Sequence, residues 1–252
     1  MTGLVRAEFR KLFTTQVWFW LLLISLALTA LQVVGNILGA DNHLDEIRHV
    51  HTTLTSASSA GVAAFILGAL SVTTEFRYQT ITPTVLITPS RWTIITAKLS
   101  SSVLMGLFYA LLCTVVALAM ALPWLSSDGI GNALGDNWSA VIEAFVVVAL
   151  YALLGLGAGA LLKNQIVAVV VGLIFLVVVQ NIVLAIPGVK YAYAYLPAGL
   201  ERAITLGSGP GIDRTPNGVH LFPVWGGIIG FVIWGTGLAV LGAGLTLNRD
   251  IT

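Results

Sequence analysis

Residues 139–162 and 166–186 read SAVIEAFVVVALYALLGLGAGALL and IVAVVVGLIFLVVVQNIVLAI, and only three residues separate the two runs. Each run matches the length of about 20 apolar residues with which a helix crosses the hydrocarbon core of a bilayer. The first run contains one charged residue, Glu143 near its start, and the second contains none. A transmembrane β-strand would alternate apolar and polar residues over about ten positions, whereas both runs are continuous. The stretch therefore predicts two consecutive membrane-spanning helices.

Four further runs have the same character and lie at residues 17–39, 54–74, 99–122 and 221–247. Apolar residues make up 57% of the 252-residue chain and charged residues only 9%, against about 25% charged residues in a soluble domain. This composition excludes a disordered chain and argues strongly against a soluble enzyme. It predicts an all-α integral membrane protein with six spans in one domain, residues 1–252. The net charge of +1 gives no indication of a nucleic-acid partner.

The orientation of the spans follows from the lysines and arginines, which are enriched on the cytoplasmic side of membrane proteins. With both termini inside, eight of these residues are cytoplasmic and four are outside. The cytoplasmic set is Arg6, Arg10, Lys11, Arg77, Arg91, Lys98, Lys163 and Arg249, and the outer set is Arg48, Lys190, Arg202 and Arg214. The sequence therefore predicts an N-in, C-in topology.

The first residues form an amphipathic pattern over Leu4–Phe13. Apolar side chains recur at the helical spacing that places Phe9 and its neighbours on one face, and Arg6, Arg10 and Lys11 occupy the remainder. Such a pattern favours a helix that lies in the cytoplasmic membrane interface. A basic flank that merely orients the first span is the alternative.

The segment between the second and third spans contains two prolines at a helical distance. Thr82 is a suitable N-cap and Pro83 a suitable first residue for a short helix, which ends before Pro89 because a residue that precedes proline avoids the α region. Val85 and Leu86 belong to its apolar side. A short, partly apolar cytoplasmic helix is suited to bind in the groove of a partner, although an ordinary interfacial loop helix fits the pattern too.

This segment resembles the ABC-2 family of transporter permeases, in which an acidic residue, a Gly-Thr pair, a Leu-x-Thr-Pro-x-Arg run and a downstream lysine follow the second span. Gln79 stands where the family has glycine. The resemblance implies that the segment is the coupling helix that contacts a separate ATP-binding subunit, with the coupling residues Glu75, Arg77, Gln79, Thr80, Pro83, Val85, Leu86, Pro89, Arg91 and Lys98. It also implies location in a bacterial cell membrane.

The outer segment between spans five and six contains alternate tyrosines followed by Pro197, Glu201 and Arg202. Tyrosines are typical of the headgroup region, and Pro197 fits the start of a short helix with Glu201 and Arg202 on its polar side. A surface loop with aromatic anchors explains the pattern equally well. The family resemblance implies instead short re-entrant helices at this place.

Polar residues within the spans are candidates for the substrate pathway, because buried polar groups are costly in a bilayer and often line cavities. The candidates are Gln32, Asn36, Gln180 and Asn181. Hydrogen bonding between helices is the alternative explanation for them. The histidines His43, His49 and His51 lie among acidic residues, but their spacing matches no zinc signature, and we interpret them as part of a solvated loop without a metal.

The function that these features favour is the permease subunit of an ATP-driven transporter, an exporter by resemblance. A second permease, identical or related, would complete the pathway, and two ATP-binding subunits would bind ATP and Mg²⁺. The chain has no Walker A segment, so we expect no enzyme activity and no cofactor in it alone. An ion-coupled secondary transporter with inverted repeats is the alternative. Two observations argue against it: no charged residue lies at the centre of a span, and no span is visibly broken. An intramembrane enzyme ranks third, because no span contains an aspartate or histidine.

Overall fold

The computed structural model describes residues 2–39, 47–78, 91–127, 133–206 and 218–247. Within these residues every regular element is a helix. The elements are α1 (Thr2–Thr14), α2 (Val17–Leu38), α3 (Ile47–Leu54), η1 (Thr55–Ser59), α4 (Ala60–Arg77), α6 (Arg91–Ser127), α7 (Ala133–Asp136), α8 (Trp138–Leu162), α9 (Gln165–Leu173), η2 (Ile174–Val179), α10 (Gln180–Ala185), η3 (Lys190–Tyr195), α11 (Pro197–Thr205) and α12 (Val224–Leu247).

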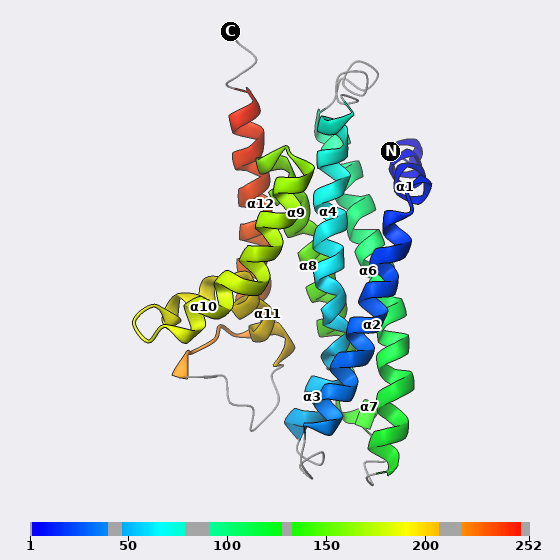
Figure 1. Ribbon diagram of the computed structural model, residues 1–252, viewed down its shortest axis with the longest axis vertical. Helices are drawn as coiled ribbons and strands as arrows, with labels where there is room; N and C mark the ends of the chain where they lie inside the picture. Colours follow the sequence, from blue (N-terminus) through cyan, green and yellow to red (C-terminus); the bar gives the residue numbers. More distant parts are fainter. Residues whose placement is uncertain (1, 40–46, 79–90, 128–132, 207–217, 248–252) are drawn as a thin grey trace.

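In the part of the chain that the structure describes, six helical stretches are long and apolar enough to cross a membrane, which confirms the predicted number of spans. They are Val17–Leu38, Val50–Arg77, Thr96–Ser127, Trp138–Leu162, Gln165–Ala185 and Val224–Gly242. Helices α4 and α8 form the centre of the bundle, with α6 and α2 on one side and α12 on the other (Figure 1). Helix α1 lies at the same end of the bundle as the last turns of α4, α8 and α12 (Figure 1).

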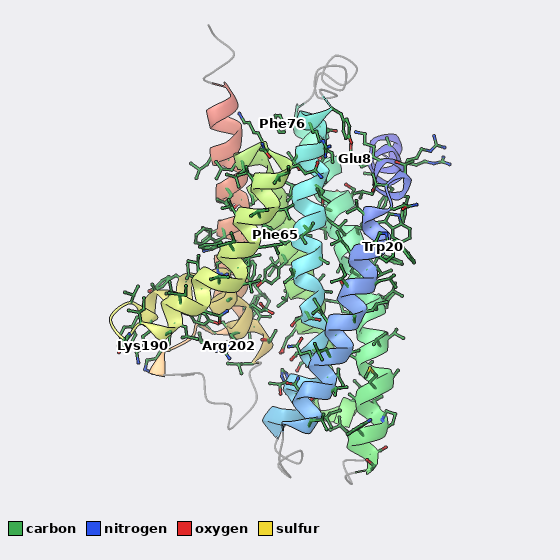
Figure 2. The ribbon with its side chains drawn as sticks, viewed as in Figure 1. Glu8, Trp20, Phe65, Phe76, Lys190 and Arg202 are labelled. Carbon is green, nitrogen blue, oxygen red and sulfur yellow. The ribbon has the colours of Figure 1, made fainter. Side chains whose placement is uncertain are left out.

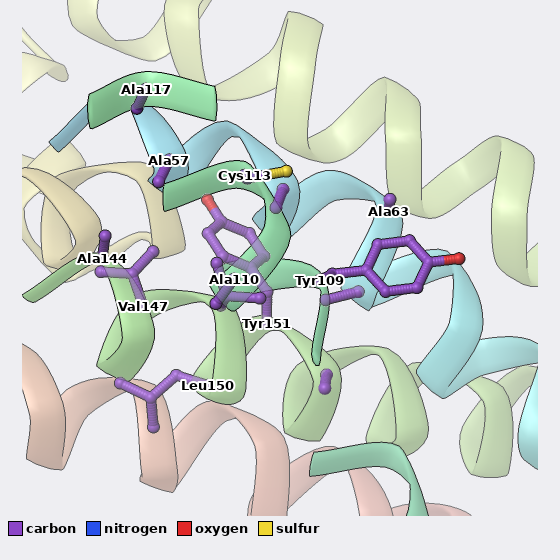
Figure 3. Packing of buried hydrophobic residues seen from close by; sticks show 14 of the residues in the cluster. Ala57, Ala63, Tyr109, Ala110, Cys113, Ala117, Ala144, Val147, Leu150 and Tyr151 are labelled. Atoms are coloured by element: carbon purple, nitrogen blue, oxygen red, sulfur yellow. The ribbon is translucent and has the colours of Figure 1, made fainter. Parts of the chain in front are cut away.

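The central helices approach each other closely because small residues line their contact. A Cβ on Gly68 of α4 would lie 2.2 Å from the carbonyl oxygen of Ala152 of α8, and a Cβ on Gly155 of α8 would lie 1.9 Å from the carbonyl oxygen of Phe65. Buried alanines surround the rings of Tyr109 and Tyr151 in the same core (Figure 3). Close backbone packing of this kind is typical of helices in membranes, where burial of apolar surface alone gives no driving force for association.

Two residues explain how the fourth span turns directly into the fifth. Lys163 ends α8 in the left-handed conformation, with φ 53°. The side chain of Asn164 then caps α9, because its Oδ1 accepts hydrogen bonds from the backbone N–H groups of Ile166 (3.0 Å) and Val167 (3.2 Å). An N-cap asparagine satisfies donors that have no partner within the helix.

The fifth span changes its winding near its centre, where η2 is a π-helical turn between α9 and α10. This differs from the expectation that no span is interrupted, because a π turn leaves no mark in an apolar sequence. Bulges of this kind redirect a helix, and the α10 end of the span points away from α2 and α4 (Figure 1).

The second and sixth spans begin at other residues than the hydropathy predicts. The helical path of the second span starts at Val50 and not at residue 54, because the polar residues of α3 and η1 are buried between helices. The sixth helix starts at Val224 and not at residue 221. Leu221 is apolar and buried, but it packs beside α11 and not within α12.

Candidate functional site

Four charged side chains from three helices meet at the end of the bundle where α4 ends and α6 begins. Glu8 and Lys11 come from α1, Glu75 from α4 and Lys98 from α6. Lys98 Nζ lies 2.8 Å from Glu75 Oε1 and 3.4 Å from Glu8 Oε2. Lys11 Nζ lies 2.9 Å from Glu8 Oε1 and 2.9 Å from Glu75 Oε1. We call these four residues the charge cluster, and Figure 2 shows the position of Glu8 between α1 and α4.

The side chains of the charge cluster are mostly buried, so each charge needs a partner of opposite sign. The side chains of Glu8, Glu75 and Lys98 are 8%, 4% and 7% exposed, and that of Lys11 is 48% exposed. Burial disfavours the charged form of Lys11, but hydrogen bonds to Glu8 and Glu75 and the charges of both carboxylates outweigh this effect and raise the pKa of Lys11. Two carboxylates and two ammonium groups cancel in charge. Each member therefore depends on the others, since an unpaired buried charge is costly.

A line of hydrogen bonds extends the charge cluster between α4 and α6. Lys98 Nζ donates to the backbone carbonyl oxygen of Ser71 (3.0 Å). One turn further along α6, Ser102 Oγ donates to Ser71 Oγ (3.1 Å), which donates to the carbonyl oxygen of Gly68 (2.7 Å). The two helices that flank residues 79–90 are thus joined by buried ion pairs and by hydroxyl groups.

The predicted coupling residues are therefore distributed over several places. Glu75 and Lys98 meet in the charge cluster, whereas Arg77 is exposed and donates to Oε1 of Gln165 (3.1 Å) at the start of α9. Arg91 is the first residue of α6, as expected for a helix that runs into the third span. The remaining predicted coupling residues lie outside the described residues: Gln79, Thr80, Pro83, Val85, Leu86 and Pro89.

The sequence interpretation missed Glu8. The predicted amphipathic helix exists as α1, Phe9 packs against the core, and Arg6 and Arg10 are exposed. Glu8, however, is 6% exposed, although a carboxylate in a basic interfacial helix suggests a solvated position. The signal was present, because Glu8 is the one acid in that helix and stands three residues before Lys11, at the spacing of an ion pair.

Two of the four candidate pathway residues join helices. Gln180 is fully buried, and its Oε1 accepts from the backbone N–H of Ala198 (2.5 Å) in the first turn of α11. Asn36 Nδ2 donates to the carbonyl oxygen of Thr52 (3.3 Å) and to Ser56 Oγ (3.2 Å). The other two, Gln32 and Asn181, are exposed on the surface of the bundle. A role of these four residues in transport stays a prediction.

Gln180 supplies the cap that α11 lacks, because Leu196 at the N-cap offers no polar side chain. We expect Gln180→Ala to destabilise the folded protein by about 1–2 kcal/mol, through loss of this bond and of a buried polar partner. The neighbouring Asn181→Ala is the matched control, because Asn181 is exposed and its side chain donates to the carbonyl oxygen of Val177 one turn earlier in the same span. Thermal unfolding of both variants in detergent measures the difference, and equal melting temperatures would contradict the capping role.

The prediction that His51 belongs to a solvated loop is wrong. Helix α3 places it inside the bundle, where it is 5% exposed and its Nε2 lies 3.2 Å from Oε2 of the buried Glu143 of α8. The structure does not describe His43 or the side chain of His49. The error arose because α3 has low hydropathy and was assigned to the loop.

Comparison with known proteins adds no assignment. A search of protein-family models finds no match to the chain, and a search of curated proteins finds none either.

Proposed function

We propose that the chain is the membrane-spanning permease subunit of an ABC transporter of the ABC-2 type. Two permeases, identical or related, form the pathway, and two separate ATP-binding subunits hydrolyse ATP and drive export across a bacterial cell membrane. The architecture of six membrane-spanning helices supports this proposal. The observation that carries it is the charge cluster, which joins α1, α4 and α6 at both ends of residues 79–90.

The charge cluster suits the transmission of force. A partner that moves residues 79–90 pulls on Arg77 and Tyr78 at the end of α4 and on Arg91 at the start of α6. Glu75 and Lys98 lie behind these attachment points, and their ion pair prevents α4 and α6 from moving independently. Glu8 and Lys11 couple α1 to the same unit.

The central position of α4 then distributes the motion. Helix α4 packs along α8 over its length, with the backbone contacts at Gly68 and Gly155. Helix α8 in turn packs along α12. Densely packed helices shift as units and do not deform continuously, so a displacement of α4 reaches the far side of the bundle.

The ion-coupled carrier, which is the alternative function, has one observation in its favour. The predicted spans contain no carboxylate, lysine or arginine near the midplane for a coupling proton, whereas in the structure Glu201 of α11 accepts a hydrogen bond from Tyr151 of the fourth span.

Substitution within residues 79–90 tests the permease proposal. We expect Val85→Asp to abolish ATP hydrolysis by the assembled transporter and to weaken its assembly, because a carboxylate on the apolar side would be buried without a partner in the docking groove. Val85→Leu, which stays apolar, is the matched control and should retain activity. Co-purification of the ATP-binding subunit and ATP hydrolysis are the measurements. Full assembly and activity of both Val85→Asp and Leu86→Asp would contradict a coupling role for the segment.

A further inference from the structure

Glu201 of α11 has its carboxylate directed at two hydroxyl groups of the bundle. Tyr151 of α8 donates its OH to Glu201 Oε2 (2.7 Å), and Ser58 of η1 donates its OH to Glu201 Oε1 (3.4 Å). Both carboxylate oxygens thus accept hydrogen bonds from different elements. Helix α11 packs against α12 and α8, so Glu201 joins α11 to α8 and to η1 at once.

Tyr151 is held rigidly in the position that this bond requires. The residue is 5% exposed, and its ring contacts the ring of Phe231 of α12 edge to face, with centroids 5.1 Å apart. On the other side, a Cβ on Gly61 of α4 would lie 2.5 Å from Cδ2 of Tyr151. The absence of a side chain at position 61 therefore makes room for the ring. The phenol hydroxyl is a preorganised donor and not a mobile surface group.

The surroundings of Glu201 contain little compensating charge. Among the described residues, no ion pair includes Glu201. Arg202, the adjacent residue, is exposed and interacts with Tyr193 of η3. Helices α10 and α12 contribute no titratable side chain. The pair of Glu143 and His51 lies about two helical turns from Tyr151, because Glu143 precedes Tyr151 by eight residues on α8. The ionised carboxylate has two neutral donors but no cation in contact.

We propose that Glu201 is a proton-binding site, occupied and released while the chain is folded, whose occupancy sets how firmly α11 is held against α8 and η1. A proton on either oxygen removes the charge that burial disfavours, so the neutral carboxyl keeps α11 firmly in place. The ionised carboxylate accepts both hydroxyl hydrogen bonds, but these do not offset the whole cost of burying its charge, so α11 is held less firmly. The residue retains partial exposure, which lets the proton exchange with the surroundings.

The balance of forces on the carboxyl supports this assignment. Burial raises the pKa of Glu201 above the usual glutamate value, and the hydrogen bonds from Tyr151 and Ser58 and the charge of Arg202 offset only part of that rise. The sign of the effect on stability follows. Between the ordinary value of 4.5 and the raised one, the folded state binds more protons than the unfolded chain, so stability falls as pH rises through this window.

Labelling with dicyclohexylcarbodiimide, a hydrophobic reagent that modifies protonated carboxyl groups, tests the proposal on the purified full chain. We expect an adduct at Glu201 whose yield falls with rising pH at a midpoint above that of exposed glutamates. Tyr151→Phe removes a donor to the ionised form and should move the midpoint up by about one pH unit. Tyr195→Phe is the matched control, because Tyr195 is 65% exposed and its ring packs against Phe222, and it should leave the midpoint unchanged.

Infrared difference spectroscopy removes any dependence on access of the reagent. A protonated-carboxyl band that titrates in the wild type and is missing in Glu201→Gln is the expected result. Two outcomes would overturn the proposal: the lack of such a band, or a labelling midpoint that Tyr151→Phe leaves in place. Neither outcome depends on an ATP-binding partner, so the proton site and the proposed permease function are tested separately.

Discussion

Lys98→Met should lower the free energy of unfolding by about 3–5 kcal/mol, the range expected when one partner of a buried ion pair is removed. Methionine matches the length of lysine but leaves Glu75 and Glu8 with one cation between them. The variant also lacks the hydrogen bond that Lys98 donates to the carbonyl oxygen of Ser71. The expected decrease exceeds that for exposed ion pairs, whose contribution is about 0–1 kcal/mol.

The single cysteine of the chain makes this measurement direct. Cys113 is fully buried in α6, so a thiol-reactive fluorophore reports unfolding of the native sequence during a thermal ramp. We expect the double variant Lys98→Met with Glu75→Gln to be more stable than Lys98→Met alone, because the cluster regains neutrality as Glu8 and Lys11. Simply additive losses would show that the four charges do not act as a unit.

Gly155→Val should prevent the bundle from closing. A Cβ at this position lies 1.9 Å from the carbonyl oxygen of Phe65, and that oxygen is backbone and cannot turn aside. Helices α4 and α8 would have to separate along their whole contact. The loss of folding free energy from this separation should exceed the cost of about 1–3 kcal/mol that is usual when a side chain overpacks a core. We expect little or no monodisperse protein in size-exclusion chromatography.

Gly35→Ala is the matched control for that experiment. Gly35 is also a helical glycine in a span, but a Cβ there meets nothing within 4 Å. Alanine should be neutral or stabilising by up to about 1 kcal/mol, because glycine is the poorer helix former. Normal yield of Gly155→Val would mean that α4 and α8 do not pack through their backbones.

The sequence predicts the spans well because the cost of exposing polar groups to lipid is large and local. Each apolar run therefore indicates a helix without knowledge of its neighbours. Gly155 and Gly159 form a small-xxx-small pattern of the kind that lets membrane helices pack closely, and Cβ atoms there would meet the carbonyl oxygens of Phe65 and Ala69.

Polar positions were harder to predict, because their environment is set by tertiary contacts. Glu8 was not predicted as a site residue, and Glu201 was assigned to the polar side of a short helix, yet both meet partners distant in sequence, Lys98 and Tyr151. Separations of 90 and 50 residues leave no local trace in the sequence. The π turn of η2 was not predicted for the same reason, since a change in helical winding depends on packing contacts and not on composition.

Native mass spectrometry of the assembly extracted from its own membrane tests the central claim most directly, because the masses identify and count every subunit. The proposed function predicts two permeases together with two copies of a subunit that contains a Walker A sequence. An active, intact assembly that consists of this chain alone would contradict the proposed function and favour the ion-coupled carrier.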